Sequence, residues 1–179
     1  RYVVLAGGAM ENALTFRGWT LPGVMTAGAA QTMFNMHRVL PGRRALVVGA
    51  GNVGLIVAYQ FLQAGGEVAA VVEALPTIGG YGVHASKIRR AGVPVLTSHT
   101  ILEARGERRV QRAIVAQVDA DMGSIAGTER GFDVDCILLA VGLSPMAELA
   151  SLAGCEFTYI PSLGGHVPVH DQQMETSVP

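Results

Sequence analysis

Cysteine is scarce in this sequence of 179 residues. The two cysteines, Cys136 and Cys155, are too few for a disulfide framework, and no Cys-x-x-Cys pair is present that would serve as a redox centre. Cys136 lies in an apolar run, where a free cysteine usually packs as a small hydrophobic side chain. The shortage predicts a protein of a reducing compartment, and we expect a cytoplasmic location.

Charged residues and long hydrophobic runs are also scarce. Only 15% of the residues are charged and the formal net charge is -1 at pH 7, which argues against the basic surface of a nucleic-acid-binding protein. The most apolar stretch, residues 45–59, is shorter than a membrane-spanning helix and contains the polar residue Asn52. We therefore expect no nucleic-acid partner and no membrane span.

The residue constellations of metal sites and of catalytic triads are missing as well. His166 and His170 are four residues apart, but Pro168 lies between them and argues against a helix that presents both to one ion. No arrangement of a nucleophile, a base and oxyanion donors emerges along the chain. We expect neither a metal ligand nor a catalytic residue here.

Glycine, by contrast, is abundant, with 23 residues, and its clearest pattern lies between a strand and a helix. Residues 45–48 are typical of a strand that is covered on both faces. Apolar residues then recur at helical spacing as far as Ala64, and Gly65 and Gly66 end the helix. Residues 67–73 form a second strand, so the unit predicts two parallel strands joined by a right-handed crossover.

The turn between this first strand and its helix has the spacing Gly49-x-Gly51-x-x-Gly54. Gly49 permits a tight turn, Gly51 leaves room for the backbone to approach a diphosphate, and Gly54 lets the helix pack closely on the strand. The free N–H groups and the dipole at the start of the helix favour a phosphate. The residues expected to bind the cofactor here are Gly49, Ala50, Gly51, Asn52, Val53 and Gly54.

The second strand ends in a carboxylate, Glu73, about 20 residues beyond the motif, where a ribose-binding acid is expected. Such a carboxylate accepts hydrogen bonds from ribose hydroxyls and repels a 2′-phosphate. Residues 74–77 contain no arginine or lysine to neutralise that phosphate, so we predict NAD rather than NADP. Two alternatives stay open: Glu73 is a solvated strand end, and the glycine turn is only structural. The glycine-rich residues 77–82 either close over the nucleotide or simply connect two elements.

Further elements are predicted on either side of this unit. Helices are expected over residues 29–39 and 83–91, strands over residues 2–6, 93–96 and 136–140, and an antiparallel meander over residues 101–133. The predicted fold class is therefore α/β: a Rossmann-like three-layer domain with a parallel central sheet and an antiparallel β-meander.

Several stretches resemble a known family. They are residues 3–9, residues 18–24, the glycine motif, and Ile-Leu-Leu-Ala-Val-Gly-Leu-Ser-Pro at residues 137–145. Together they are similar to the flavoproteins with two dinucleotide-binding domains, the pyridine nucleotide-disulfide oxidoreductase superfamily. Residues 21–31 and 92–97 resemble the FAD- and NAD-binding subunits of amine-oxidising complexes: sarcosine oxidase alpha, opine oxidase, dye-linked proline dehydrogenase and hydrogen cyanide synthase.

The resemblance implies an NAD domain inserted into an FAD domain. Residues 24–145 would be the NAD-binding Rossmann-like domain, and residues 1–23 and 146–179 would be flanking segments of a split FAD-binding domain. It also places three residues near the nicotinamide nucleotide: Ala140, Val141 and Gly142. The first residue is not Met, so we expect a piece of a longer protein that does not bind FAD stably by itself.

These features together predict the NAD(H)-binding domain of an FAD/NAD-dependent oxidoreductase, a dehydrogenase in which hydride passes between nicotinamide and flavin. The resemblance suggests amine or amino-acid oxidation. The expected partners are NAD(H) and the rest of the FAD domain or other subunits, and the piece alone is expected to be inactive. The alternative is a non-catalytic NAD-sensing or subunit-interaction module.

Overall fold

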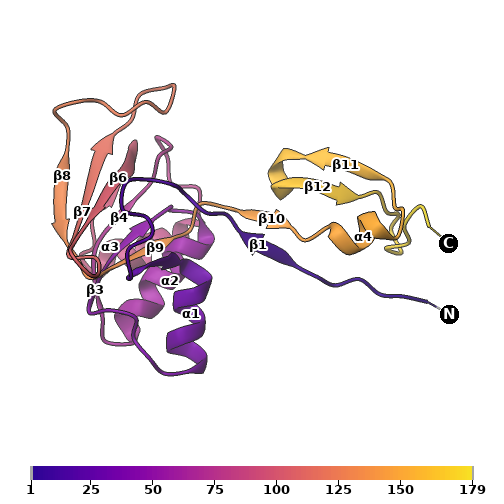
Figure 1. Ribbon diagram of the computed structural model, residues 1–179, viewed down its shortest axis with the longest axis horizontal. Coiled ribbons are helices and arrows are strands. Elements are labelled where there is room, and N and C mark those ends of the chain that lie inside the picture. The colour runs from indigo at the N-terminus through magenta and orange to yellow at the C-terminus, as the bar shows by residue number, and fades with distance from the viewer. Residues whose placement is uncertain (1, 179) are drawn as a thin grey trace. The chain divides into compact units, whose positions relative to one another are not determined.

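The computed structural model describes residues 2–178 (Figure 1). The chain folds into two compact units. The larger unit is continuous, Ala13–Val141, and the smaller one is made from the segments on either side of it.

The larger unit is built on a parallel sheet of five strands in the order β2-β9-β3-β4-β5. The strands are β2 (Val24–Thr26), β9 (Cys136–Leu139), β3 (Arg44–Val48), β4 (Glu67–Val72) and β5 (Val95–Leu96). The strand β9 comes last in the chain of this unit but lies between β2 and β3. The predicted parallel sheet is therefore confirmed.

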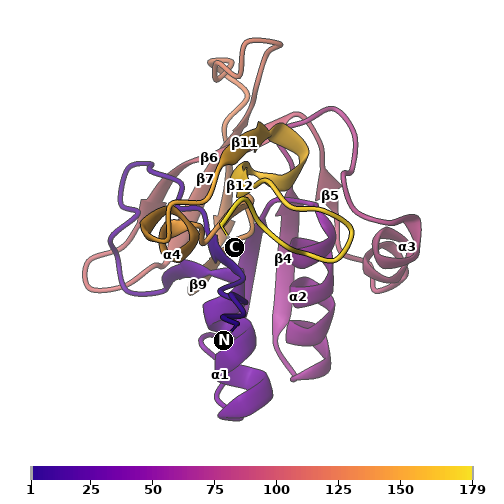
Figure 2. The ribbon, with the colours of Figure 1, turned by 90° about the vertical axis from the view of Figure 1, so that its right-hand side faces the viewer.

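Helices cover one face of this sheet and an antiparallel meander covers the other (Figures 1 and 2). The helices are α1 (Ala27–Met36), α2 (Asn52–Gln63) and α3 (Gly82–Arg90), and the meander strands are β6 (His99–Arg105), β7 (Arg112–Gln117) and β8 (Arg130–Asp133). The predicted α/β three-layer Rossmann-like class, with its antiparallel meander, is confirmed.

Alternation along β3 explains why both faces are covered. Ala45 and Val47 pack in the core beneath the helices, and Leu46 and Val48 pack in the core beneath the meander. All four are buried, because successive side chains of a strand point to opposite faces. A strand with apolar residues at every position therefore needs a layer on each side.

The smaller unit consists of short elements. The strand β1 (Ala9–Glu11) pairs antiparallel with β10 (Leu143–Pro145), and β11 (Phe157–Ile160) pairs antiparallel with β12 (Gly165–Pro168) across the 3-10 turn η1 (Pro161–Leu163). A one-turn helix, α4 (Glu148–Leu152), completes it.

The strand expected over residues 2–6 is wrong. No described residue in this range lies in a strand, and Tyr2, Val3 and Val4 are 97%, 84% and 88% exposed. A strand needs a hydrogen-bonding neighbour, and among residues 2–178 none pairs with this apolar run. No helix in the described part of the chain is both long enough and apolar enough to cross a membrane.

Candidate dinucleotide site

The turn from β3 into α2 has a shape that requires glycine at two of its three motif positions. Gly49 has φ +106° and donates its N–H to the carbonyl of Val72 at 2.7 Å, and a Cβ added there would collide with the carbonyl oxygen of Ala140. A Cβ on Gly54 would collide with the carbonyl oxygen of Gly49 and lie 3.2 Å from the Cβ of Ala140. Both glycines therefore allow strand, turn and helix to pack closely.

Gly51 is the position that faces open space. Its φ is -71°, and an added Cβ would meet no atom within 4 Å. Gly51 is also the N-cap of α2, which has no side-chain cap and no acidic residue in its first turn. The first N–H groups of a helix have no partner inside the helix, and the dipole adds a partial positive charge. This end of α2 thus fits a diphosphate, with room above Gly51 for it.

Glu73, directly after β4, reaches back to the same turn. One carboxylate oxygen accepts the N–H of Ala50 at 2.7 Å, and the other accepts the N–H of Leu75 at 3.0 Å. The half-buried side chain is thereby held in one place. Each carboxylate oxygen has two lone pairs, so Glu73 retains capacity to accept hydroxyl donors. The structure brings together the two predicted parts of the site, the glycine turn and the acid.

Two contacts that the sequence pattern did not indicate join the turn to the loop before α3. The N–H of Gly80 donates to the carbonyl of Ala50 at 2.9 Å, and the N–H of Tyr81 donates to Oδ1 of Asn52 at 2.7 Å. The only signal in the sequence is the glycine-rich character of residues 77–82. Val53, the next residue of the motif, is 38% exposed.

The predicted residues after β9 divide between the two units. Ala140 lies beside the glycine turn, where its N–H donates to the carbonyl of Val48 at 2.7 Å and its own carbonyl limits the space at Gly49. Val141 is the last residue of the larger unit. Gly142 belongs to the smaller unit, with φ +121°, and its carbonyl accepts the N–H of Asn12 at 3.0 Å.

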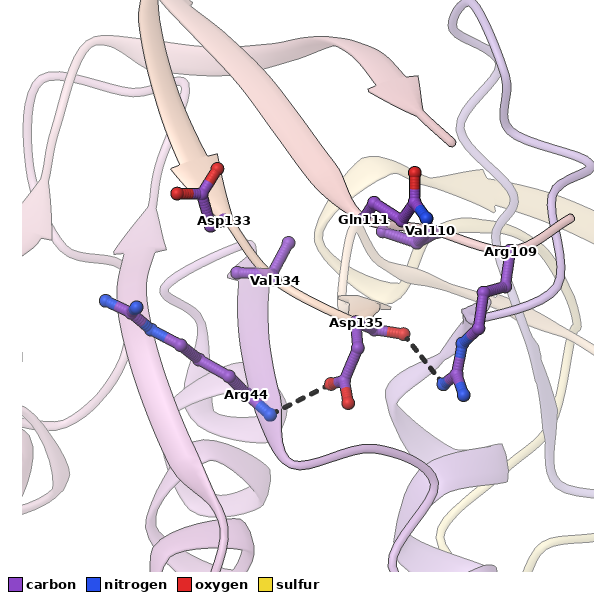
Figure 3. Close-up of a pocket in the computed structure, with 7 residues that line it drawn as sticks. All are labelled: Arg44, Arg109, Val110, Gln111, Asp133, Val134 and Asp135. Carbon is purple, nitrogen blue, oxygen red and sulfur yellow. Dashed lines mark hydrogen bonds between the residues drawn. The ribbon is translucent and has the colours of Figure 1, made fainter. Parts of the chain in front are cut away.

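An open hollow of about 380 Å³ lies at the other end of the parallel strands, where β3 and β9 begin (Figure 3). Its lining residues are Arg44, Arg109, Val110, Gln111, Asp133, Val134 and Asp135. Both carboxylates there already have partners. Asp135 accepts the backbone N–H groups of Arg43 and Arg44, each at 2.9 Å, and Asp133 pairs with Arg112 at 2.9 Å. Ligands of parallel sheets bind at the opposite, carboxyl edge, so this hollow is not our candidate site.

Neither cysteine has the features of a reactive centre. Burial, followed by the nearby charge of Asp135, raises the pKa of the Cys136 thiol to about 12, which keeps it protonated at neutral pH. Cys155 is half-buried, and its Sγ lies 3.5 Å from Oγ1 of Thr176. Among residues 2–178, no group of three or more His, Cys, Asp or Glu side chains is arranged to hold a metal ion.

A parallel sheet between a layer of helices and an antiparallel meander, with a glycine turn and an acid at its carboxyl edge, defines a Rossmann-like domain of the dinucleotide-binding class. The family model for pyridine nucleotide-disulphide oxidoreductases matches residues 1–179. The chain therefore belongs to this family. The resemblance inferred from the motifs is confirmed.

Individual relatives agree with this assignment. An opine oxidase chain from Agrobacterium tumefaciens (strain Ach5) is 29% identical over 98% of the present sequence, which spans 37% of that protein. The alpha chain of sarcosine oxidase from Corynebacterium sp. (strain P-1) is 30% identical over 93% of the sequence, and the match spans 17% of that protein. A solved FAD-dependent pyridine nucleotide-disulphide oxidoreductase from Desulfovibrio vulgaris matches 96% of the sequence and 42% of its own, at 26% identity and a TM-score of 0.68. The chain thus spans less than half the length of each of these proteins.

Proposed function

We propose that this chain is the NAD(H)-binding part of a dehydrogenase in which hydride passes between nicotinamide and flavin. The observation that carries the proposal is the Glu73 carboxylate, held at 2.7 Å from the backbone N–H of the glycine turn. A carboxylate in this place has acceptors for ribose hydroxyls, and it lies next to the uncapped start of α2 that suits a diphosphate.

Each residue of the motif has a separate task in this proposal. Gly49 and Gly54 shape the turn, and Gly51 leaves the space that the diphosphate occupies. The backbone N–H groups of Asn52 and Val53 face the phosphates as the first donors of α2. Bound NAD(H) supplies the hydride chemistry, and the chain orients it.

The proposed preference for NAD over NADP rests on charge. Glu73 would repel a 2′-phosphate, and residues 74–80 contain no arginine or lysine. Replacing Glu73→Gln keeps the size but removes the negative charge, and its one amide oxygen can accept only one of the two backbone N–H groups that Glu73 holds. We expect NAD⁺ to bind about tenfold more weakly, since a hydrogen bond to a charged group contributes about 1.5–3 kcal/mol. Rejection of NADP⁺ should relax in the same variant.

Isothermal titration of the full-length protein with NAD⁺ and NADP⁺ tests the proposed preference for NAD and the role of Glu73. Glu67→Gln is the matched control, because Glu67 begins the same strand at its far end and its side chain is 77% exposed. Equal affinity of the wild-type protein for both nucleotides, or unchanged NAD⁺ binding by Glu73→Gln, would refute the assignment.

The wider assignment is also part of the proposal. Residues 24–145 are assigned to the NAD-binding domain and the flanking segments to a split FAD-binding domain, with Ala140, Val141 and Gly142 near the nicotinamide. The names of the relatives, opine oxidase and sarcosine oxidase, favour amine or amino-acid oxidation and work with other subunits. Anaerobic mixing of the full-length flavoprotein with NADH tests the hydride step. A flavin that stays oxidised while NADH binds would instead support a non-catalytic NAD-sensing module.

A further inference from the structure

The short segment of residues 79–81 is fastened to the glycine turn at two points. The N–H of Gly80 donates to the carbonyl of Ala50 at 2.9 Å, and the N–H of Tyr81 donates to Oδ1 of Asn52 at 2.7 Å. The second bond joins a side chain to a backbone group 29 residues away. It ties the loop before α3 to the first residue of α2.

Gly80 packs closely against the glycine turn, whereas the glycines on either side of this contact, Gly79 and Gly82, have open space around them. A Cβ on Gly80 would lie 2.6 Å from Cδ1 of Leu55 and 3.0 Å from the carbonyl carbon of Gly51, and Leu55 is fully buried. By contrast, a Cβ on Gly79 or Gly82 would meet nothing within 4 Å. The segment is therefore packed closely against the glycine turn at Gly80, while Gly79 and Gly82 on either side face open space.

The start of α2 has no side-chain cap, because its N-cap residue is Gly51. Asn52 follows as the first helical residue, and its side chain does not supply a cap either. Here Oδ1 of Asn52 accepts the N–H of Tyr81, and α2 has no side-chain cap. The helix thus keeps its first donors available for an anion, while the loop beside Gly51 is held in place.

We propose that Asn52 is a positioning residue of the dinucleotide site. It holds residues 79–81 against the glycine turn, so that they form a wall of the site beside the space above Gly51. This inference rests on the proposed binding of NAD. It predicts that the tether strengthens nucleotide binding because the loop is already ordered when the nucleotide arrives.

The variant Asn52→Ala removes the tether without endangering the fold, because alanine is a good helix former. We expect NAD⁺ to bind about fivefold more weakly to the full-length protein in isothermal titration, as is typical for the loss of one hydrogen bond. The amide of Tyr81 should exchange its hydrogen faster in the absence of nucleotide. The melting temperature should match that of the control Asn35→Ala, a helical asparagine that is exposed and whose side chain bonds Gln60 at a distance of 3.5 Å.

Two further variants separate the tether from other effects of the substitution. Asn52→Asp keeps an acceptor for the Tyr81 amide, so protection of that amide should return, while NAD⁺ binding stays weak because a carboxylate then faces the phosphates. Gly80→Ala breaks the contact from the loop side and should weaken NAD⁺ binding to a similar extent. Combined with Asn52→Ala, it should add little more, because both changes release the same loop segment from the glycine turn.

The proposal is overturned if Asn52→Ala binds NAD⁺ like the wild-type protein, or if it lowers the melting temperature and leaves the affinity unchanged, as a purely structural residue would. Normal protection of the Tyr81 amide in this variant would also overturn it. If the wild-type protein does not bind NAD⁺, the proposed function fails together with this inference. If Glu73→Gln weakens NAD⁺ and Asn52→Ala does not, only the role of Asn52 is refuted.

Discussion

Gly51 and Gly54 belong to one motif, yet the structure predicts opposite results for the same substitution at the two positions. Gly51→Ala adds a methyl group where no atom lies within 4 Å and where φ is -71°, a value that alanine adopts freely. Gly54→Ala adds one that collides with the backbone carbonyl of Gly49. The first change should affect the ligand, and the second should affect the fold.

The magnitudes follow from these surroundings. At Gly51, alanine is a poorer N-cap by about 0.5–1 kcal/mol, but it restricts the unfolded chain and recovers about 0.4–1 kcal/mol. The free energy of unfolding should therefore change by less than about 0.5 kcal/mol. At Gly54, overpacking against backbone costs about 3 kcal/mol, and the higher helix propensity of alanine returns about 1 kcal/mol. A net loss of about 2 kcal/mol lowers the melting temperature by about 4–8 °C.

For NAD⁺ affinity, the larger effect is expected at Gly51 and not at Gly54. The methyl group of Gly51→Ala occupies the space proposed for the diphosphate and displaces it from the N–H groups of α2. Loss of one charge-assisted hydrogen bond, about 1.5–3 kcal/mol, weakens NAD⁺ binding by about ten- to a hundredfold. Thermal unfolding and isothermal titration of both variants check the two halves separately. Wild-type affinity in Gly51→Ala would show that no diphosphate lies above this residue, and a large loss of stability there would show that the space is not open.

Much of the larger unit was predictable because its elements carry strong local patterns. The run from Ala45 to Val48 is apolar at every position, which is typical of a strand covered on both faces. The carboxyl ends of neighbouring parallel strands lie at the same edge of a sheet, so the spacing predicted an acid, Glu73, at the edge where the glycine turn lies. The bond from the Ala50 N–H to Glu73 is added by the structure.

The features that were not predicted depend on contacts between residues distant in the sequence, which produce no hydrophobic periodicity. An asparagine that bonds a backbone amide 29 residues away, as Asn52 does with Tyr81, looks like any polar residue in a motif. The apolar residues from Tyr2 to Leu5 show the converse case. Their apolar pattern indicates a preference for burial but does not show which strand would pair with them. No strand among the described residues does so.

Two further predictions concern the other end of the strands. Asp135→Ala should lower the free energy of unfolding by about 2–3 kcal/mol in urea titrations, because two backbone N–H groups at the start of β3 lose their acceptor. Asp133→Ala, which loses only an exposed ion pair with Arg112, should cost less than about 1 kcal/mol; equal losses would contradict the assigned roles. The pH dependence of stability tests Cys136. Its pKa is about 12 in the folded protein against 9.0 as the ordinary value, so above pH 9 the unfolded chain loses a proton that the native state keeps. Stability should then fall by about 1.4 kcal/mol per pH unit between pH 9 and 12. Cys136→Ala removes this contribution, and a variant that loses stability as steeply as the wild-type protein over that range would show that the buried thiol is not its source.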